Sequence, residues 1–111
     1  TAVLDAVMEL IVRAGKPAPA AKLMLIPPAW SHDGKIPREH KALFGYYNCV
    51  MSPWDGPAAI VATDGRWAIA GMDRNGLRPM RYYITENGYL LLGSEAGMVP
   101  THNLEVVEKG R

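Results

Sequence analysis

The chain contains a single cysteine, Cys49, which is the first candidate for a catalytic nucleophile. A cysteine nucleophile needs a base within hydrogen-bond reach and a donor for the oxyanion. The nearest histidine, His40, precedes Cys49 by nine residues and does not share a helix face with it. Free cysteine is also among the most commonly buried residue types. We therefore expect Cys49 to have a packing role.

Thr1 is the second candidate, because an N-terminal threonine can attack a carbonyl group with its own α-amine as the base. Such a nucleophile must project freely from the end of an extended strand. Thr1 instead precedes a stripe of apolar residues at helical spacing, where its hydroxyl suits the N-cap position. The sequence favours the capping role.

The histidines show no metal-binding pattern. His32, His40 and His102 form no pair at ligand spacing, and no carboxylate cluster converges with them. Adjacent residues on a helix point in different directions, so Glu39 next to His40 is typical of a solvated surface. A metal site is not expected.

The richest stretch for chemistry lies between two predicted strands. It reads Asp73-Arg74-Asn75-Gly76-Leu77-Arg78-Pro79. Asn75 and Gly76 tolerate positive φ, which can align successive N–H groups into an anion-binding concavity. Arginines at 74, 78 and 81 supply positive charge nearby, and Asp73 could neutralise one of them. Taken alone, the stretch is more typical of a wide hairpin with solvated arginines.

Composition excludes several classes of partner. The 111 residues carry 12 Lys+Arg against 11 Asp+Glu, a formal charge of +1, so neither nucleic acid nor an anionic membrane is an expected partner. With this neutral balance, Tyr46, Tyr47 and Trp54 are expected in a core or interface rather than stacked on bases. One cysteine allows no internal disulfide, which favours a reducing, cytoplasmic setting. No run of about 18 apolar residues predicts a membrane span.

Three helices are predicted in the first half of the chain. Apolar residues at Val3, Leu4, Val7, Met8 and Ile11 predict a helix over 1–14 that stops at Gly15. A shorter helix over 19–25 must end before the two prolines at 27 and 28, and residues 27–36 form a loop. A third helix begins at Pro37 and carries an apolar stripe from residue 43 to residue 51.

Strands are predicted in the second half. Asp64-Gly65 is a two-residue hairpin signal, and Asn87-Gly88 is another. The predicted strands cover 58–63, 67–72, 80–85 and 89–93, with a short fifth strand over 104–107. The expected fold is α+β in one domain, mainly helical over 1–52 and an antiparallel meander over 57–108.

Two of these strands are apolar on both faces. Residues 58–62 and 90–92 show no alternation, as expected of strands that are covered on both sides. Three helices cover one face only. This pattern, and a chain that ends at Arg111 without a predicted element, indicates a piece of a longer polypeptide.

The order and spacing of several motifs resemble the later part of the glutaminase domain of glutamate synthases. The motifs are residues 53–59, Asp64-Gly65, residues 73–79, Arg81-Tyr82 and residues 93–97. Residues 1–15 and 24–27 also resemble that family, so the likeness covers nearly the whole chain. The Asp-Arg-Asn-Gly-Leu-Arg-Pro motif is specific to it.

This resemblance implies a class II glutamine amidotransferase with the N-terminal-nucleophile hydrolase fold, in which two antiparallel sheets are stacked between helical layers. In this family an amino-terminal cysteine attacks the amide of glutamine, and an Asn-Gly pair stabilises the oxyanion. Glutamate is released, and the ammonia passes to a synthase region that aminates 2-oxoglutarate. The parent enzyme is expected to use FMN and an iron–sulfur cluster, with none of these cofactors in this segment.

The resemblance assigns almost none of these catalytic and substrate-binding residues to this chain. The nucleophile, the arginine and the oxyanion pair belong to a preceding segment, and a substrate-binding aspartate is expected immediately before Thr1. Neither Cys49 nor Asn75-Gly76 matches a family catalytic position. The chain is therefore expected to be inactive alone and to need the remainder of its polypeptide as its partner.

What carries over is the 73–79 motif, expected to support the sheet near the active site, with Ser94 and Glu95 as its companions on the next strand. Two alternatives stay open. One is a free-standing α+β module that binds an anion through the 73–79 loop. The other is a class II amidotransferase of purine or amino-sugar synthesis, although the Pro-Trp-Asp-Gly-Pro run at 53–57 favours glutamate synthase.

Overall fold

A computed structural model describes residues 2–100 and 105–111 and shows helices followed by strands. The helices are α1 (Ala2–Arg13), α2 (Ala18–Leu25) and α3 (Arg38–Val50). The strands are β1 (Ala59–Thr63), β2 (Ala68–Met72), β3 (Arg81–Thr85), β4 (Leu90–Gly93) and β5 (Val106–Gly110). The predicted α+β class is confirmed. No helix in the described ranges is long and apolar enough to cross a membrane.

Local signals set the ends of the helices as predicted. Gly15 takes φ +97° just after α1, a conformation that glycine adopts without strain. Pro17 stands at the N-cap of α2, and α2 ends at Leu25 before the prolines at 27 and 28. Pro37 stands at the N-cap of α3.

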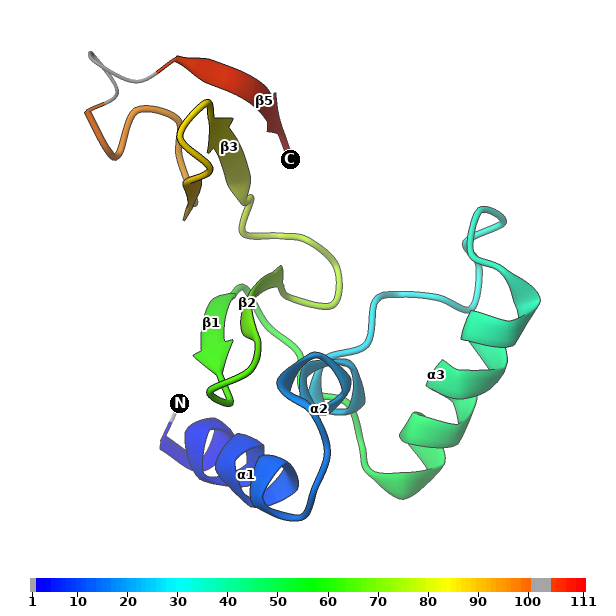
Figure 1. The fold of residues 1–111 in the computed structure, drawn as a ribbon. Coiled ribbons are helices and arrows are strands. Elements are labelled where there is room, and N and C mark those ends of the chain that lie inside the picture. The colour runs from blue at the N-terminus through cyan, green and yellow to red at the C-terminus, as the bar shows by residue number, and fades with distance from the viewer. Residues whose placement is uncertain (1, 101–104) are drawn as a thin grey trace.

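The hydrophobic core lies among the three helices. Leu25 of α2 is 1% exposed and is the largest fully buried side chain. The other buried members of this cluster are Ile11, Ala21, Met24, Ile26, Phe44 and Tyr47. Figure 1 shows α2 between α1 and α3, with the β1–β2 hairpin above α1. Ile60 of β1 packs against the cluster, so the first hairpin shares this core.

The first hairpin has a longer connection than the Asp64-Gly65 signal predicts. Thr63 pairs with Ala68, which leaves four residues rather than two between the strands. The Asp64 carboxylate accepts hydrogen bonds from the N–H groups of Arg66 at 2.9 Å and Trp67 at 2.7 Å. It also accepts one from Ala18 at the start of α2, at 2.8 Å. These bonds lower the pKa of Asp64 and join the hairpin to the helix.

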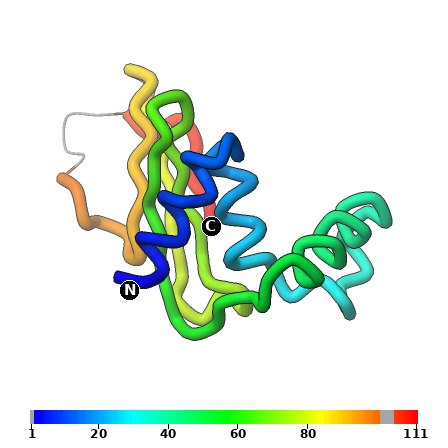
Figure 2. The backbone as a smooth tube through the Cα atoms, turned by 90° about the horizontal axis from the view of Figure 1, so that it is seen from below, coloured from blue at the N-terminus to red at the C-terminus, as the bar shows by residue number. Residues whose placement is uncertain are grey.

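The strands form two sheets, and the prediction of one continuous meander is wrong. β1 pairs only with β2, whereas the second sheet has the order β4-β3-β5. The segment between β2 and β3 leads away from β2 rather than turning back along it (Figure 1). Figure 2 shows the strands of both sheets running in similar directions. The loop described below lies in the chain between β2 and β3.

The second sheet contains one predicted hairpin and one element that was placed incorrectly. Gly88, at φ +78°, donates to the Thr85 carbonyl at 2.9 Å, which closes the β3–β4 hairpin at the predicted Asn87-Gly88 turn. The fifth strand exists but covers Val106–Gly110 instead of 104–107, of which 104 lies outside the described residues. It pairs antiparallel with β3, so Tyr82 stands opposite Gly110.

The sheets expose apolar side chains on one face, as the absence of alternation in their sequences suggests. Val61 of β1 is 78% exposed and Leu90 of β4 is 57% exposed. The radius of gyration is 15.5 Å, larger than the ~13 Å of a compact domain of this size. The described residues therefore leave much apolar sheet surface uncovered.

Candidate functional site

The loop over residues 73–79 is organised around the carboxylate of Asp73, which is 5% exposed. Its Oδ1 accepts hydrogen bonds from the N–H groups of Arg78 at 3.0 Å and Ala58 at 3.3 Å. Its Oδ2 accepts from Leu77 at 3.0 Å and Asn75 at 3.2 Å. These backbone donors lower the pKa of Asp73 to about 2 because they favour the charged form. The predicted concavity of N–H groups exists, and its anion belongs to the chain itself.

The suggestion that Asp73 neutralises one of the arginines is wrong. Within residues 2–100 and 105–111, the only ion pair joins Arg13 and Glu9 on α1 at 2.7 Å. Arg78 and Arg81 are exposed, and Arg74 is half-buried. The arginines thus remain on or near the surface, while the backbone compensates the buried charge.

Other contacts of the loop attach it to neighbouring segments. The Arg74 carbonyl accepts the N–H of Ala29 at 3.1 Å, and the Asn75 amide donates to Asp55 Oδ1 at 3.3 Å. Gly76 takes φ +63° and donates to the Asp73 carbonyl at 3.1 Å. The motif is therefore bonded to the α2–α3 connection and to the 53–57 run.

Lys22 is a member of this site that sequence reasoning missed. Burial lowers the pKa of Lys22, and the nearby Asp73 carboxylate partly opposes that effect. Its ammonium group donates to the Ile26 carbonyl at 3.1 Å. The stem of Lys22 crosses β2 at Gly71, where an added Cβ would lie 2.7 Å from Lys22 Cε. The spacing of α2 residues in the sequence carries no sign of this crossing, because it depends on how α2 packs against β2.

We expect Gly71→Ala to lower the free energy of unfolding of the polypeptide that carries this segment by about 0.5–1 kcal/mol, because the far end of the lysine side chain must shift from its place. In Gly71→Ala, Lys22→Ala the clash is removed, so the cost of the alanine at 71 should be smaller than in the single variant. Chemical denaturation of the four proteins of this cycle measures the difference. Gly34→Ala is the control, because a Cβ there meets nothing within 4 Å. Equal costs of Gly71→Ala with and without Lys22 would contradict the assigned contact.

The structure brings the two family motifs to one hollow. Ser94 and Glu95 follow β4 and face the end of the 73–79 loop across a space of about 360 Å³. The lining residues are Pro57, Leu77, Arg78, Pro79, Ser94 and Glu95. Arg78 and Glu95 line it without forming an ion pair. This hollow joins the 53–57 run, the motif loop and the end of β4.

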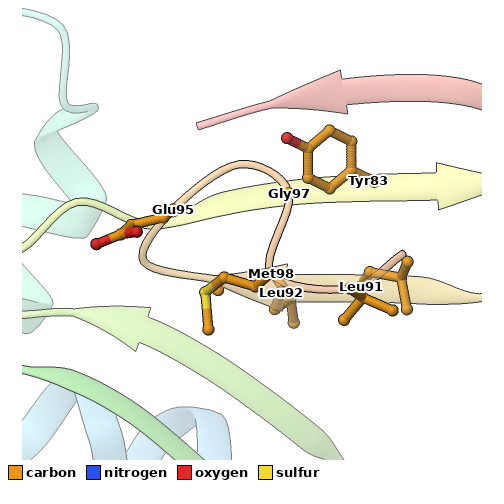
Figure 3. Close-up of a pocket in the computed structure, with 8 residues that line it drawn as sticks. Tyr83, Leu91, Leu92, Glu95, Gly97 and Met98 are labelled. Carbon is orange, nitrogen blue, oxygen red and sulfur yellow. The ribbon is translucent and has the colours of Figure 1, made fainter. Parts of the chain in front are cut away.

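A second, smaller pocket of about 90 Å³ lies on the β3–β4 sheet (Figure 3). Tyr83 and Leu91 come from the paired strands, and the turn that carries Gly97 and Met98 folds over them. Glu95 is its one charged lining residue. It offers no nucleophile with a base, so it adds no catalytic group.

The candidate nucleophiles and metal ligands do not come together. Cys49 is exposed, so the expectation that it packs in the interior is wrong for this chain. It lies at the end of α3, whereas His40 is exposed in the first turn of the same helix. Thr1 and His102 lie outside the described residues. Within the part that the structure describes, no group of three His, Cys, Asp or Glu could hold a metal ion.

The three aromatic candidates divide between core and surface. Tyr47 is buried in the helical core, and Trp54 packs against it, as predicted. The Trp54 N–H donates to the Leu25 carbonyl at 2.8 Å, which attaches the 53–57 run to α2. Tyr46 is 63% exposed, with its ring centroid 5.9 Å from that of Tyr47.

The residues present do not fit the cofactors that the resemblance implies for the parent enzyme. An iron–sulfur cluster needs several cysteine thiolates, and this chain has one cysteine. An FMN phosphate needs N–H donors or cations arranged toward it, and the N–H groups of Asn75, Leu77 and Arg78 are already bonded to Asp73.

Comparison with known proteins agrees with the motif pattern. The sequence model of the family described as "Glutamine amidotransferases class-II" matches residues 1–111. The chain is 57% identical over 108 residues to the glutamate synthase [NADPH] large chain of Azospirillum brasilense, which covers 97% of this chain and 7% of that protein. It is 40% identical over 111 residues to the corresponding large chain of Bacillus subtilis (strain 168), covering 100% of this chain and 7% of that protein.

Relatives outside the bacteria show the same pattern. Glutamate synthase [NADH] of Saccharomyces cerevisiae is 44% identical over 112 residues, covering 100% of this chain and 5% of that protein. The chain thus spans less than a tenth of the length of these curated relatives. Because the family match extends over the full length of the sequence, this chain belongs to the class II glutamine amidotransferases.

Proposed function

We propose that this chain forms the later part of the glutaminase domain of a glutamate synthase, which hydrolyses glutamine and delivers the ammonia to 2-oxoglutarate. The observation that carries the proposal is the 57% identity over 97% of the chain to a glutamate synthase large chain. In this assignment residues 1–111 form one part of the amidotransferase domain. The segment before Thr1 supplies the nucleophile, its base and the oxyanion donors.

The geometry supports a structural role for this part. The motif loop is attached to the α2–α3 connection and to the 53–57 run, it lines the Ser94-Glu95 hollow, and it holds no free catalytic pair. We assign to the loop the task of fixing the first sheet relative to the β4 end. The exposed apolar side chains of β1 and β4, such as Val61 and Leu90, then belong to faces that the upstream segment covers in a stacked-sheet, N-terminal-nucleophile fold.

Nothing in the site favours the alternative of a free-standing anion-binding module. Three of the N–H groups that would bind the anion, those of Asn75, Leu77 and Arg78, donate to Asp73. An added anion would have to displace a charged, buried carboxylate from these donors.

We expect the intact parent polypeptide to release ammonia from glutamine, and residues 1–111 alone to do so more slowly by a factor of at least about 10⁴, because the nucleophile is elsewhere. A coupled assay for ammonia and glutamate measures both rates. Formation of two glutamates from glutamine and 2-oxoglutarate by the intact protein, with a reductant supplied to provide the two electrons, identifies the synthase reaction. Turnover by residues 1–111 that is abolished by Thr1→Ala would refute the proposal and support catalysis by the N-terminal threonine.

A further inference from the structure

The outer side of α3 is an apolar surface that nothing in the described part of the chain covers. Helix α3 turns Phe44 and Tyr47 into the core. Five residues on its opposite side are exposed, and together they form what we call the outer face of α3: Ala42, Leu43, Tyr46, Cys49 and Val50. Residues 43, 46 and 50 follow the i, i+3, i+7 spacing of one helical stripe.

The outer face lacks the charges that a solvated helix surface normally carries. All charged residues of α3 lie in its first turn, and residues 42–54 contain none. Helix α1 offers the contrast, because its exposed side carries Glu9 and Arg13 as an ion pair. An exposed tyrosine beside leucine and valine, with no charge among them, is typical of an interface core.

The position of α3 separates its outer face from the uncovered sheet faces. In Figures 1 and 2, α3 projects to one side of the molecule, away from both sheets. Its main contacts with other elements are to α2. The outer face of α3 is therefore a separate surface from the one that exposes Val61 and Leu90 on the sheets.

We propose that the outer face of α3 docks onto the synthase portion of the parent polypeptide, as the contact through which the glutaminase domain is attached to it. The inference rests on the proposed function, since relatives of which this chain makes up 7% contain a long remainder of polypeptide. Within that remainder, the preceding glutaminase segment is needed at the sheet faces. The synthase portion is the occupant that fits a lateral, uncharged helix surface.

The docking is tested by placing the photoreactive residue p-benzoylphenylalanine at position 46 in the full-length parent protein. Tyr46 is 63% exposed, so an aromatic replacement is not expected to disturb folding. We expect irradiation to attach position 46 to a peptide of the synthase portion, identified by mass spectrometry. The same residue at position 9, on the charged side of α1, is the control and should give a yield lower by about fivefold or more.

Cys49 provides an independent measurement on the same surface. In the folded full-length protein we expect alkylation of Cys49 to be at least about tenfold slower than in the urea-unfolded protein, measured on the peptide that contains residue 49. Alkylation of Cys49 at the unfolded rate would overturn the proposal, as would cross-links from position 46 only to the upstream glutaminase segment or to a second copy. Both readouts report contact and not turnover. They therefore distinguish failure of this inference from failure of the proposed glutaminase activity.

Discussion

Replacement of Asp73 by asparagine is expected to lower the Tm of the polypeptide that carries this segment by roughly 5–10 °C. Each carboxylate oxygen of Asp73 accepts two backbone N–H groups, so either orientation of an asparagine amide places an NH₂ group against two donors. The substitution also removes the negative charge beside Lys22. Thermal unfolding followed by circular dichroism or calorimetry measures the shift.

The loss of stability in Asp73→Asn is expected to depend on pH. The pKa of Asp73 falls from 3.8 to about 2 in the folded state. A depressed folded-state pKa contributes stability that is fully present above the unfolded value and is lost as the pH falls toward the folded value. The Tm difference between wild type and Asp73→Asn should therefore be constant above about pH 5 and should narrow between pH 4 and pH 2.

Asp33→Asn is the matched control for both measurements. Asp33 accepts one hydrogen bond, from Lys35 N–H at 2.8 Å in an exposed turn. Its replacement should change the Tm by less than about 2 °C. A shift at Asp73 that is no larger than the shift at Asp33 would show that the carboxylate does not organise the loop.

Local signals were sufficient to predict the helices and the turn at Asn87-Gly88. Proline and glycine act on their immediate neighbours, so Gly15, Pro17 and Pro37 set helix ends wherever the rest of the chain lies. The α+β class follows from the same local patterns. The likeness of the 73–79 motif to a family was also readable in the sequence, because it depends on residue identity and order alone.

Long-range contacts account for the parts that could not be predicted. The carboxylate of Asp73 accepts the N–H of Ala58, which is 15 residues away in the sequence. The hairpin at Asp64-Gly65 forms as predicted, but with a longer connection, in which Asp64 binds two N–H groups of its own turn and one of α2. Strand β5 has few apolar residues, and its partner β3 is distant in the sequence. Residue spacing contains none of this information.

Truncation of Leu25, the most deeply buried leucine of the helical core, is expected to have the largest effect on stability outside the motif loop. Leu25→Ala should lower the free energy of unfolding by about 2–5 kcal/mol, through lost burial and the cavity that remains. Leu25 is 1% exposed, and the end of α2 on which it stands is bonded to Trp54 N–H at 2.8 Å. Loss of packing at Leu25 should therefore destabilise both the helical core and the attachment of the 53–57 run. Chemical denaturation of the parent polypeptide measures the cost.

Two further variants test whether the cost of Leu25→Ala comes from the burial and volume of the leucine side chain. Leu10→Ala removes the same atoms from α1, but at a side chain that is 66% exposed, and should change the free energy of unfolding by no more than about 0.5 kcal/mol. Leu25→Met nearly conserves volume and should cost less than about 1.5 kcal/mol. If Leu25→Ala cost no more than Leu10→Ala, α2 would not lie at the centre of the core. The hydrogen bond from Ala29 N–H to the Arg74 carbonyl of the motif loop would then need another explanation, because Ala29 lies in the connection that follows α2.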